Sequence, residues 1–406
     1  MGDDGGRPAS PPRASGRRTI LVAGASSVMG TLPVFLVGSL AIFIREDLGF
    51  GVSELGLVVA TFFLASAVTS APGGRLTERI GARRSMLGAA TGSGTALLAI
   101  GTLVQTLPAL AVAMAFAGVA NGIAQPAGNL AIARGVANSR QGLAFGIKQS
   151  AIPGATLVAG GMVSLIGALL TWRAAFIVLA AGAVLLALAM PADPYRTVLR
   201  KPGSMLREGD VRLLPLIVLA GAAFCGAAVG TSLASFYVES AVTGGIDART
   251  AGLLLAFGSG TGILSRLVIG WAADRRTGGH LNVVMVLLSL GAVGFLGLAA
   301  RGPLVLVAGA TVLAFAAGWG WPGLFNFTVV RLNPNAPAAA TAITQTGVFV
   351  GGVVGPATFG RIADLASYEQ AWLAAAVVNI VGTGFVLGGR ALLRRARRRQ
   401  ESDREG

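Results

Sequence analysis

The chain has 406 residues, of which 54% are hydrophobic and only 12% are charged, and 60 of them are glycines. This composition excludes an ordinary soluble protein and indicates a membrane protein. The net charge of +15 does not indicate nucleic-acid binding, because the basic residues stand in short clusters between apolar runs, without interleaved aromatic residues. With one cysteine (Cys225), one histidine (His280) and no carboxylate cluster, we expect no metal, no cofactor and no enzyme activity.

Residues 1–18 combine acids, prolines and arginines, and predict a disordered tail instead of a cleavable signal. Long apolar runs follow, and a helix that crosses a bilayer needs roughly 20 apolar residues. The predicted first bundle, residues 19–190, contains six such runs: 19–44, 55–71, 85–107, 109–133, 142–170 and 174–190. After a polar linker, residues 191–212, the predicted second bundle, residues 213–393, contains six more: 213–238, 250–273, 281–300, 304–330, 340–360 and 371–393. A basic tail, residues 394–406, ends the chain.

Lysine and arginine predict the orientation, because cytoplasmic loops retain positive charge. They concentrate in both tails, in the linker and in the loops near residues 74–84, 134–140 and 275–276. The opposite loops hold only Arg45, Arg173, Arg249, Arg301 and Arg361. We therefore expect an inner (plasma) membrane protein with both termini in the cytoplasm, surrounded by lipid and monomeric.

The two predicted bundles contain an internal repeat, and such repeats indicate the architecture of a fold. At an offset of 196 residues, acids, arginines, prolines and glutamines coincide as well as glycines. The matched pairs are Gly56 and Gly252, Gly74 and Gly270, Glu78 and Asp274, Arg79 and Arg275, Gly122 and Gly318, Pro126 and Pro322, and Gln149 and Gln345.

The loop after the second predicted span reads Gly74-Arg-Leu-Thr-Glu78-Arg79-Ile-Gly81-Ala-Arg83-Arg84. It resembles the loop signature of the major facilitator superfamily: a glycine, three residues, an acid, a basic residue, one residue, a glycine and then basic residues. Here Glu replaces the usual Asp, and Ala82 stands where a basic residue is common. The resemblance covers residues 19–393 and implies an all-α membrane protein of twelve transmembrane helices in two pseudo-symmetric six-helix bundles. It also implies alternating access to a substrate site between the bundles.

Both copies of this loop are candidate gates. The glycines allow close helix approach, and the acids can accept hydrogen bonds from the opposite half. An alternative is that the arginines only anchor the topology. The second copy keeps three residues of the motif but has Thr277 in place of the later glycine. The candidate gating residues are Gly74, Glu78, Arg79, Gly81, Arg83, Arg84, Gly270, Asp274 and Arg275.

Lys148 is the first candidate for substrate binding, because it lies about 10 Å along its helix from Gln141 at ~1.5 Å per residue, inside the membrane span. Alternatively, its side chain snorkels to the cytoplasmic interface. Gln149 follows it, and the repeat adds Thr344 and Gln345 on the matching helix.

The fourth span presents Asn121, Gln125 and Asn129 on one face, since they are four residues apart. These side chains either line the substrate path or join helices by hydrogen bonds. In the matching tenth span, Trp319 and Asn326 flank Pro322 and complete the candidate substrate-binding set. Arg266 is expected to have a structural role, neutralising an acid at the cytoplasmic end of its helix.

No acid stands in the middle of a span, whereas Lys148 does, and this favours an anionic or neutral cargo. The segments 126–129 and 145–153 are also similar to bacterial family members that take up small anions such as cyanate and organic acids. We expect a secondary transporter that moves a small, anionic solute and is coupled to protons. The alternatives are proton-driven export of drugs or amphipathic metabolites, and a membrane sensor without transport.

Overall fold

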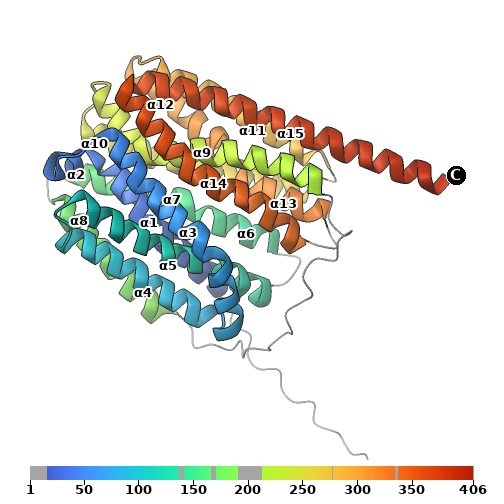
Figure 1. Cartoon of the computed structure of the whole chain (residues 1–406), viewed down its shortest axis with the longest axis horizontal. Helices are drawn as coiled ribbons and strands as arrows, with labels where there is room; N and C mark the ends of the chain where they lie inside the picture. The colour runs from blue at the N-terminus through green and yellow to red at the C-terminus, as the bar shows by residue number, and fades with distance from the viewer. Residues whose placement is uncertain are drawn as a thin grey trace, which may run out of the picture.

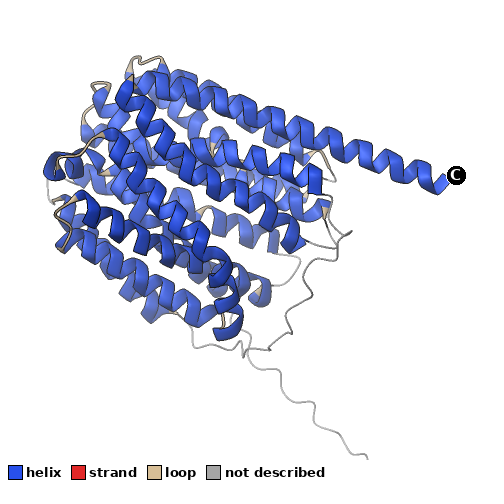
Figure 2. Ribbon diagram, in the orientation of Figure 1, coloured by secondary structure: helices blue, strands red, loops and turns tan. Residues whose placement is uncertain are grey.

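The computed structural model describes residues 16–136, 141–165, 171–190, 213–276, 278–333 and 337–405. All of the regular structure in these ranges is helical (Figure 2). The first half comprises α1 (Gly16–Ser39), α2 (Ala41–Leu48), α3 (Val52–Ile80), α4 (Ala82–Thr102), α5 (Leu107–Gly135), α6 (Gln141–Gln149), α7 (Ala151–Leu165) and α8 (Trp172–Ala189). The second half comprises α9 (Leu213–Thr243), α10 (Ala248–Asp274), α11 (His280–Ala299), α12 (Leu304–Leu313), η2 (Ala314–Gly318), α13 (Pro322–Leu332), α14 (Pro337–Leu365) and α15 (Tyr368–Glu405).

The predicted all-α membrane fold is confirmed. Ten helical segments, with α12 to α13 taken as one, are long and apolar enough to cross a membrane. The other two predicted spans are α4 and a fifth span that is divided at Ser150 into α6 and α7. The first span is divided at Leu40, and the tenth contains the π-helix η2 and a turn before Pro322. Such breaks are common at functional sites in membrane helices.

Two predicted domain boundaries differ from the structure. Helix α1 starts at Gly16, so the last residues of the predicted tail 1–18 are helical. Helix α15 continues to Glu405, so the predicted basic tail is helical through residues 394–405 and projects from the bundle (Figure 1). The predicted linker, residues 191–212, lies outside the described residues.

We name the two ends of the molecule by what lies there. The α2 end contains α2, and at the opposite end, the linker end, α8 finishes and α9 begins (Figure 1). Several helices that start at the α2 end begin at capping side chains, since the first amides of a helix lack partners within it. Thr106 accepts from the amide of Ala109 at 3.4 Å, and Asp247 accepts from the amide of Thr250 at 2.9 Å.

The halves pack tightly where glycines remove side chains between them. A Cβ atom on Gly160 of α7 would lie 2.6 Å from the carbonyl oxygen of Gly252 in α10, and one on Gly56 of α3 would lie 2.4 Å from that of Pro356 in α14. These contacts lie toward the α2 end, because α3 and α10 begin there and α7 and α14 finish there. The two bundles are therefore closely joined at that end.

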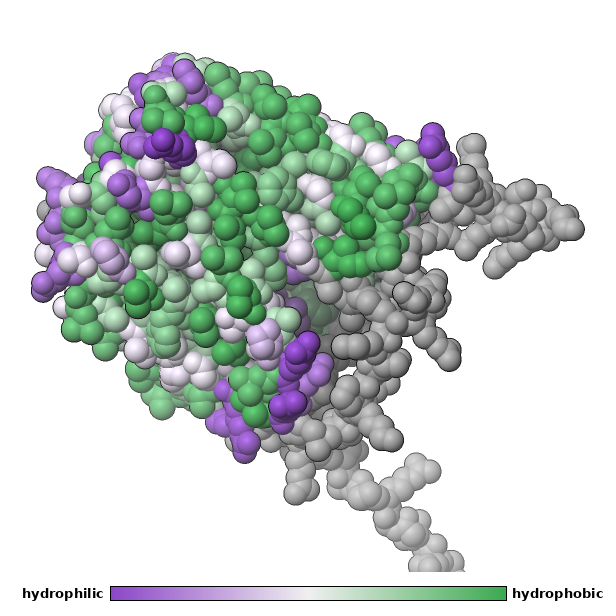
Figure 3. All heavy atoms as spheres, viewed as in Figure 1, coloured by the Kyte–Doolittle hydropathy of each residue, from purple (hydrophilic) through white to green (hydrophobic). Residues whose placement is uncertain are grey.

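The sides of the bundle are apolar, and polar residues collect at its ends (Figure 3). Large hydrophobic side chains are exposed on these sides, for example Leu64, Leu264 and Val293 in the middle of their helices. In water such a surface would be unfavourable, whereas lipid hydrocarbon accommodates it. The surface is that of a multi-pass membrane protein.

Candidate substrate site between the two halves

Lys148 lies in the last turn of α6, at the break in the fifth span, and its residue is only 3% exposed. Its ammonium group donates hydrogen bonds to the side-chain oxygens of Asn129 at 2.7 Å and Gln125 at 2.9 Å, and to the backbone oxygen of Gln125 at 3.3 Å. The side chain therefore points to α5 inside the bundle and does not snorkel. Only neutral oxygens surround the ammonium among its described partners, so its charge is not neutralised by an acid.

A chain of hydrogen bonds continues from this ammonium along α5. The side-chain amide of Gln125 donates to Asn121 at 3.2 Å, and that of Asn121 donates to the hydroxyl of Ser66 at 3.0 Å. Ser66 in turn donates to the backbone oxygen of Gly118 at 3.0 Å. The predicted polar face of the fourth span thus joins helices by hydrogen bonds, from α5 to Lys148 of α6 and to Ser66 of α3. Its role in lining the substrate path stays a prediction.

Arg266 is the second buried cation, on α10 of the other half, and is 4% exposed. Its guanidinium donates to the backbone oxygen of Gln149 at 2.7 Å and to that of Trp319 at 2.6 Å. The Gln149 oxygen is available because Pro153, four residues later, has no N–H to donate to it. The Trp319 oxygen lies in the turn between η2 and α13. Arg266 therefore connects the broken fifth and tenth spans.

This position of Arg266 is a feature of the candidate site that the sequence interpretation missed. In place of the acid expected from the sequence, two backbone carbonyls receive its hydrogen bonds. The sequence contained the same signal that pointed to Lys148, an isolated charge within an apolar run. The proximity of Asp274 in sequence obscured it. The structure places Arg266 against the backbone of Gln149, the residue that follows Lys148, so the second buried cation is attached to the fifth span beside the first.

Trp319 forms part of this junction. Its ring meets Phe35 of α1 edge to face, with ring centroids 5.7 Å apart, and the guanidinium of Arg266 lies 5.5 Å from the centroid of its ring. Because Phe35 belongs to the first half, this contact also joins the two halves. Trp319 therefore packs at the boundary instead of facing lipid.

The structure does not bring the remaining candidates into this cluster. Thr344 is buried and donates to backbone oxygens of its own helix, Ala340 and Thr341. Gln345 and Asn326 are half-buried, without hydrogen bonds to the described residues. The repeat therefore predicted matching helices, but the polar side chains of the eleventh span do not make the contacts that those of the fifth span make.

The candidate gates lie at the linker end. Gly81 separates α3 from α4 with φ of 91°, a conformation that favours glycine, which accounts for that position in the motif. Gly74 is half-buried, Glu78, Arg79 and Arg84 are exposed, and Arg83 is partly buried and has an interaction partner. No hydrogen bond or ion pair joins Glu78 to the described residues, so Glu78 does not make here the contact with the opposite half that was expected of the gate.

In the second copy, the guanidinium of Arg275 stacks on Trp271, 3.8 Å from the ring centroid, and donates to its backbone oxygen at 3.3 Å. A Cβ atom on Gly270 would meet nothing within 4 Å. The side chain of Asp274 lies outside the described residues. Arg275 is thus held within its own helix, and the gating role of this copy stays a prediction.

Comparison with known proteins connects this geometry to transporters. The family model described as "Major Facilitator Superfamily" matches residues 19–300 and 219–406. The "Probable nitrate/nitrite transporter NarK2" of Mycobacterium tuberculosis is 27% identical over 81% of this chain and 85% of its own length. An "MFS-type efflux pump" of Mycolicibacterium smegmatis is 28% identical over 64% of this chain and 63% of its own length.

Among solved structures, a bacterial homologue of the human lysosomal transporter Spinster, in an inward-facing and occupied conformation, matches with a TM-score of 0.70. The match covers 92% of this chain and 96% of that one at 16% identity, so it concerns the fold alone.

Proposed function

Because the chain belongs to the major facilitator superfamily, and is therefore a membrane transporter, we propose that it moves a small inorganic or organic anion by alternating access, coupled to protons. The observation that supports an anion most directly is the pair of buried cations, Lys148 and Arg266, at the junction of the halves. Neither has an acidic partner among the described residues. A buried charge without a counter-ion costs several kcal/mol, at an order of magnitude. An anion that binds beside both cations supplies the missing counter-charge, and its binding is favoured by the relief of this cost.

The proposal assigns particular roles to the polar residues. Gln125 and Asn129 hold the ammonium of Lys148 when no anion is bound, since their oxygens occupy its donor directions. An arriving anion competes with these neutral oxygens by forming charge-assisted hydrogen bonds, which are roughly twice as strong as neutral ones. The two backbone oxygens on Arg266 can be exchanged for anion oxygens in the same way.

Two further observations support the proposal. The relative from Mycobacterium tuberculosis is named for nitrate and nitrite, both small planar anions that suit a guanidinium fork. The loops at the linker end hold most of the lysines and arginines, and this supports a cytoplasmic location for that end. In this orientation the structure represents a transporter closed at its external end, and the α2 end is the external one.

The test is counterflow in proteoliposomes loaded with unlabelled nitrate, nitrite, cyanate, formate or acetate. We expect labelled nitrate to accumulate in at least one loaded preparation and not in liposomes without protein. Absence of counterflow with every anion, from protein that is monodisperse and oriented in the membrane, would overturn the anion assignment.

The second candidate function is export of drugs or amphipathic metabolites, which the efflux-pump relative favours. It predicts resistance to such compounds in cells that produce the protein, and counterflow of the compounds in place of anions. A cationic drug would meet the like charges of Lys148 and Arg266, so this function fits the site less well.

A further inference from the structure

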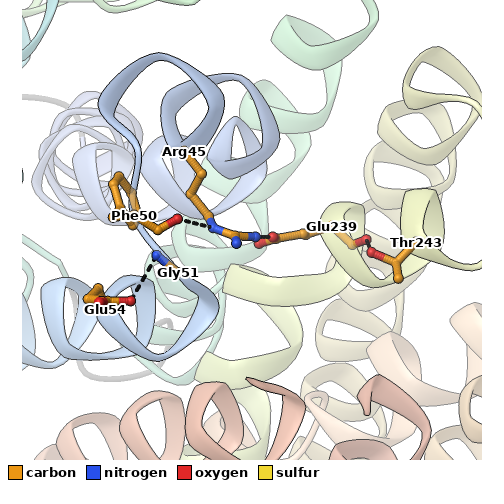
Figure 4. A network of polar contacts seen from close by, with 6 residues as sticks. All are labelled: Arg45, Phe50, Gly51, Glu54, Glu239 and Thr243. Atoms are coloured by element: carbon orange, nitrogen blue, oxygen red, sulfur yellow. Dashed lines mark hydrogen bonds and ion pairs between the residues drawn. The ribbon is translucent and has the colours of Figure 1, made fainter. Parts of the chain in front are cut away.

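An ion pair joins the two halves at the α2 end, well away from the candidate substrate site. Arg45, in the last turn of α2, forms an ion pair with Glu239, in the last turns of α9 (Figure 4). The guanidinium also donates to the backbone oxygen of Phe50 at 3.0 Å, so the loop after α2 holds it in place. One residue of the pair belongs to each half, so the pair can exist only when the halves are together at this end.

A second contact closes the same end. The hydroxyl of Ser53, at the start of α3, donates to the carboxylate of Asp364, near the end of α14, at 2.6 Å. This contact also joins the first half to the second. It is exposed, whereas Glu239 is 4% exposed, so the ion pair is the part of the closure that is shielded from water.

Glu239 differs from the other acids around it. Its Oε2 atom is buried and has no hydrogen-bond partner, and it is the one carboxylate oxygen in the described part of the chain with both properties. A cavity of ≈ 370 Å³ adjoins the pair and is lined by Ile42, Arg45, Glu46, Phe50, Glu239, Val242 and Thr243. The free oxygen and the cavity together offer a site and a route for a proton.

Three of the neighbouring acids have their own partners. Glu54 accepts from the amide of Gly51 at 2.8 Å, Asp47 pairs with Arg173, and Glu369 pairs with Arg301. Besides Arg45, the ionisable groups at this end include Glu46 and Asp47 of α2, Glu54 of α3, Arg173 of α8, Tyr237 of α9, Asp247 and Arg249 of α10, Arg301, Arg361 and Asp364 of α14, and Tyr368 and Glu369 of α15. Tyr368 interacts electrostatically with Arg45 and Asp364, and its hydroxyl has no hydrogen-bond partner in the described structure.

We propose that Glu239 is a proton-operated gate at the α2 end. When the carboxylate is ionised, its pair with Arg45 holds the halves together there. When it takes up a proton, the charge on which the pair depends disappears, and the halves can separate at this end. Because protonation and pairing exclude each other, acid favours the state that is open at the α2 end. This inference rests on the alternating access proposed above and names the residue that would link it to protons.

The test measures distances between the halves by double electron–electron resonance in the full-length protein, in a Cys225→Ala background. Spin labels at Leu103→Cys and Val305→Cys report on the α2 end, and labels at Leu76→Cys and Leu214→Cys report on the linker end. Spectra are recorded at neutral and at mildly acidic pH, with and without nitrate. We expect acid to lengthen the α2-end distance and to shorten the linker-end distance.

Three variants then isolate the gate. Glu239→Gln should populate the long α2-end distance at neutral pH, with about a tenfold change in the population ratio, because removing one partner of a buried pair is costly. It should no longer respond to acid. Glu46→Gln, which removes another acid from the same cavity, should respond as the natural chain does. If Glu239→Gln fails to yield monodisperse protein, the exchanged pair Arg45→Glu with Glu239→Arg takes its place. This variant should retain the short α2-end distance, because it keeps an ion pair between the halves.

Two outcomes separate the gate from the transport mechanism. If nitrate moves the two label pairs in opposite directions but Glu239→Gln has the natural distances and pH response, the gate is wrong and alternating access stands. If neither nitrate nor acid moves either label pair, alternating access fails, and the gate fails with it.

Discussion

Arg266 of the second half donates a 2.7 Å hydrogen bond to the backbone oxygen of Gln149, the residue that follows Lys148 in the first half. The side chain of Arg266 thus crosses the boundary between the bundles and binds the break in the fifth span, beside the residue that carries the other buried cation. Because this hydrogen bond spans the two halves, it breaks when they move apart at this position.

Replacing Arg266 tests this connection. Arg266→Lys retains the charge but has no planar fork, so we expect it to satisfy one of the two backbone oxygens and to transport poorly. Arg266→Ala leaves both oxygens buried without a donor, at a cost of about 1–3 kcal/mol for each. Thermal unfolding followed by tryptophan fluorescence should rank the melting temperatures as natural chain, Arg266→Lys and then Arg266→Ala. Equal melting temperatures for all three would contradict the bridging role.

The neighbouring glycines Gly160 and Gly161 provide a matched pair. A Cβ atom on Gly160 would lie 2.6 Å from the backbone oxygen of Gly252, whereas one on Gly161 would meet nothing within 4 Å. Both changes to alanine improve helix propensity by about 1 kcal/mol. We therefore expect Gly161→Ala to retain transport and Gly160→Ala to separate the halves at the α2 end and lose most transport. Similar counterflow rates for the two variants would show that this close approach is not needed.

Much of the fold followed from the sequence, because lipid requires every span to satisfy its own backbone groups, and this leaves long apolar runs as a clear signal. The divided spans did not follow from it. At the break near Ser150 the oxygen of Gln149 lacks a helical donor because Pro153 has no N–H, and the donor that replaces it, Arg266, comes from a distant helix. The same side chain donates to the Trp319 oxygen in the turn before Pro322.

The candidate site was predicted only in part, because spacing along one helix can be read from the sequence and contacts between helices cannot. The spacing of Asn121, Gln125 and Asn129 placed them on one helical face, and the structure adds the contacts of Gln125 and Asn129 with Lys148. The repeat suggested Thr344 and Gln345, but a repeat reports on backbone symmetry and not on which side chains meet. The pairing of Arg45 with Glu239 joins residues on different helices and has no local sequence pattern.

The hydrogen-bond chain beside Lys148 predicts graded effects. Gln125→Leu removes a direct partner of the ammonium, whereas Asn121→Leu removes a residue one step further away. We expect the KM for nitrate to fall about tenfold in Gln125→Leu, because the anion no longer competes with the Gln125 oxygens for the ammonium, and to change only about threefold in Asn121→Leu, since a hydrogen bond to a charged group contributes more than a neutral one. Counterflow at several nitrate concentrations measures both values, and the reverse order would contradict the proposed arrangement.

Cysteine labelling tests the orientation. Arg83→Cys lies at the linker end and Arg301→Cys at the α2 end, before α12 begins. In intact cells we expect a membrane-impermeant maleimide to label Arg301→Cys and to label Arg83→Cys only after permeabilisation. Labelling of both from outside would contradict the paired-bundle topology, and labelling of Arg83→Cys alone would reverse the orientation.

The most direct test of the anion site is equilibrium binding of nitrate to the purified protein by isothermal titration calorimetry, comparing the natural chain with Lys148→Met. Methionine approximates the length of the lysine stem without the charge, and Arg249→Met, which removes an exposed cation outside the site, is the control. We predict one nitrate per chain, an affinity at least about tenfold lower in Lys148→Met, equivalent to about 1.4 kcal/mol, and natural affinity in Arg249→Met. Natural affinity for nitrate in a folded Lys148→Met protein would contradict the account.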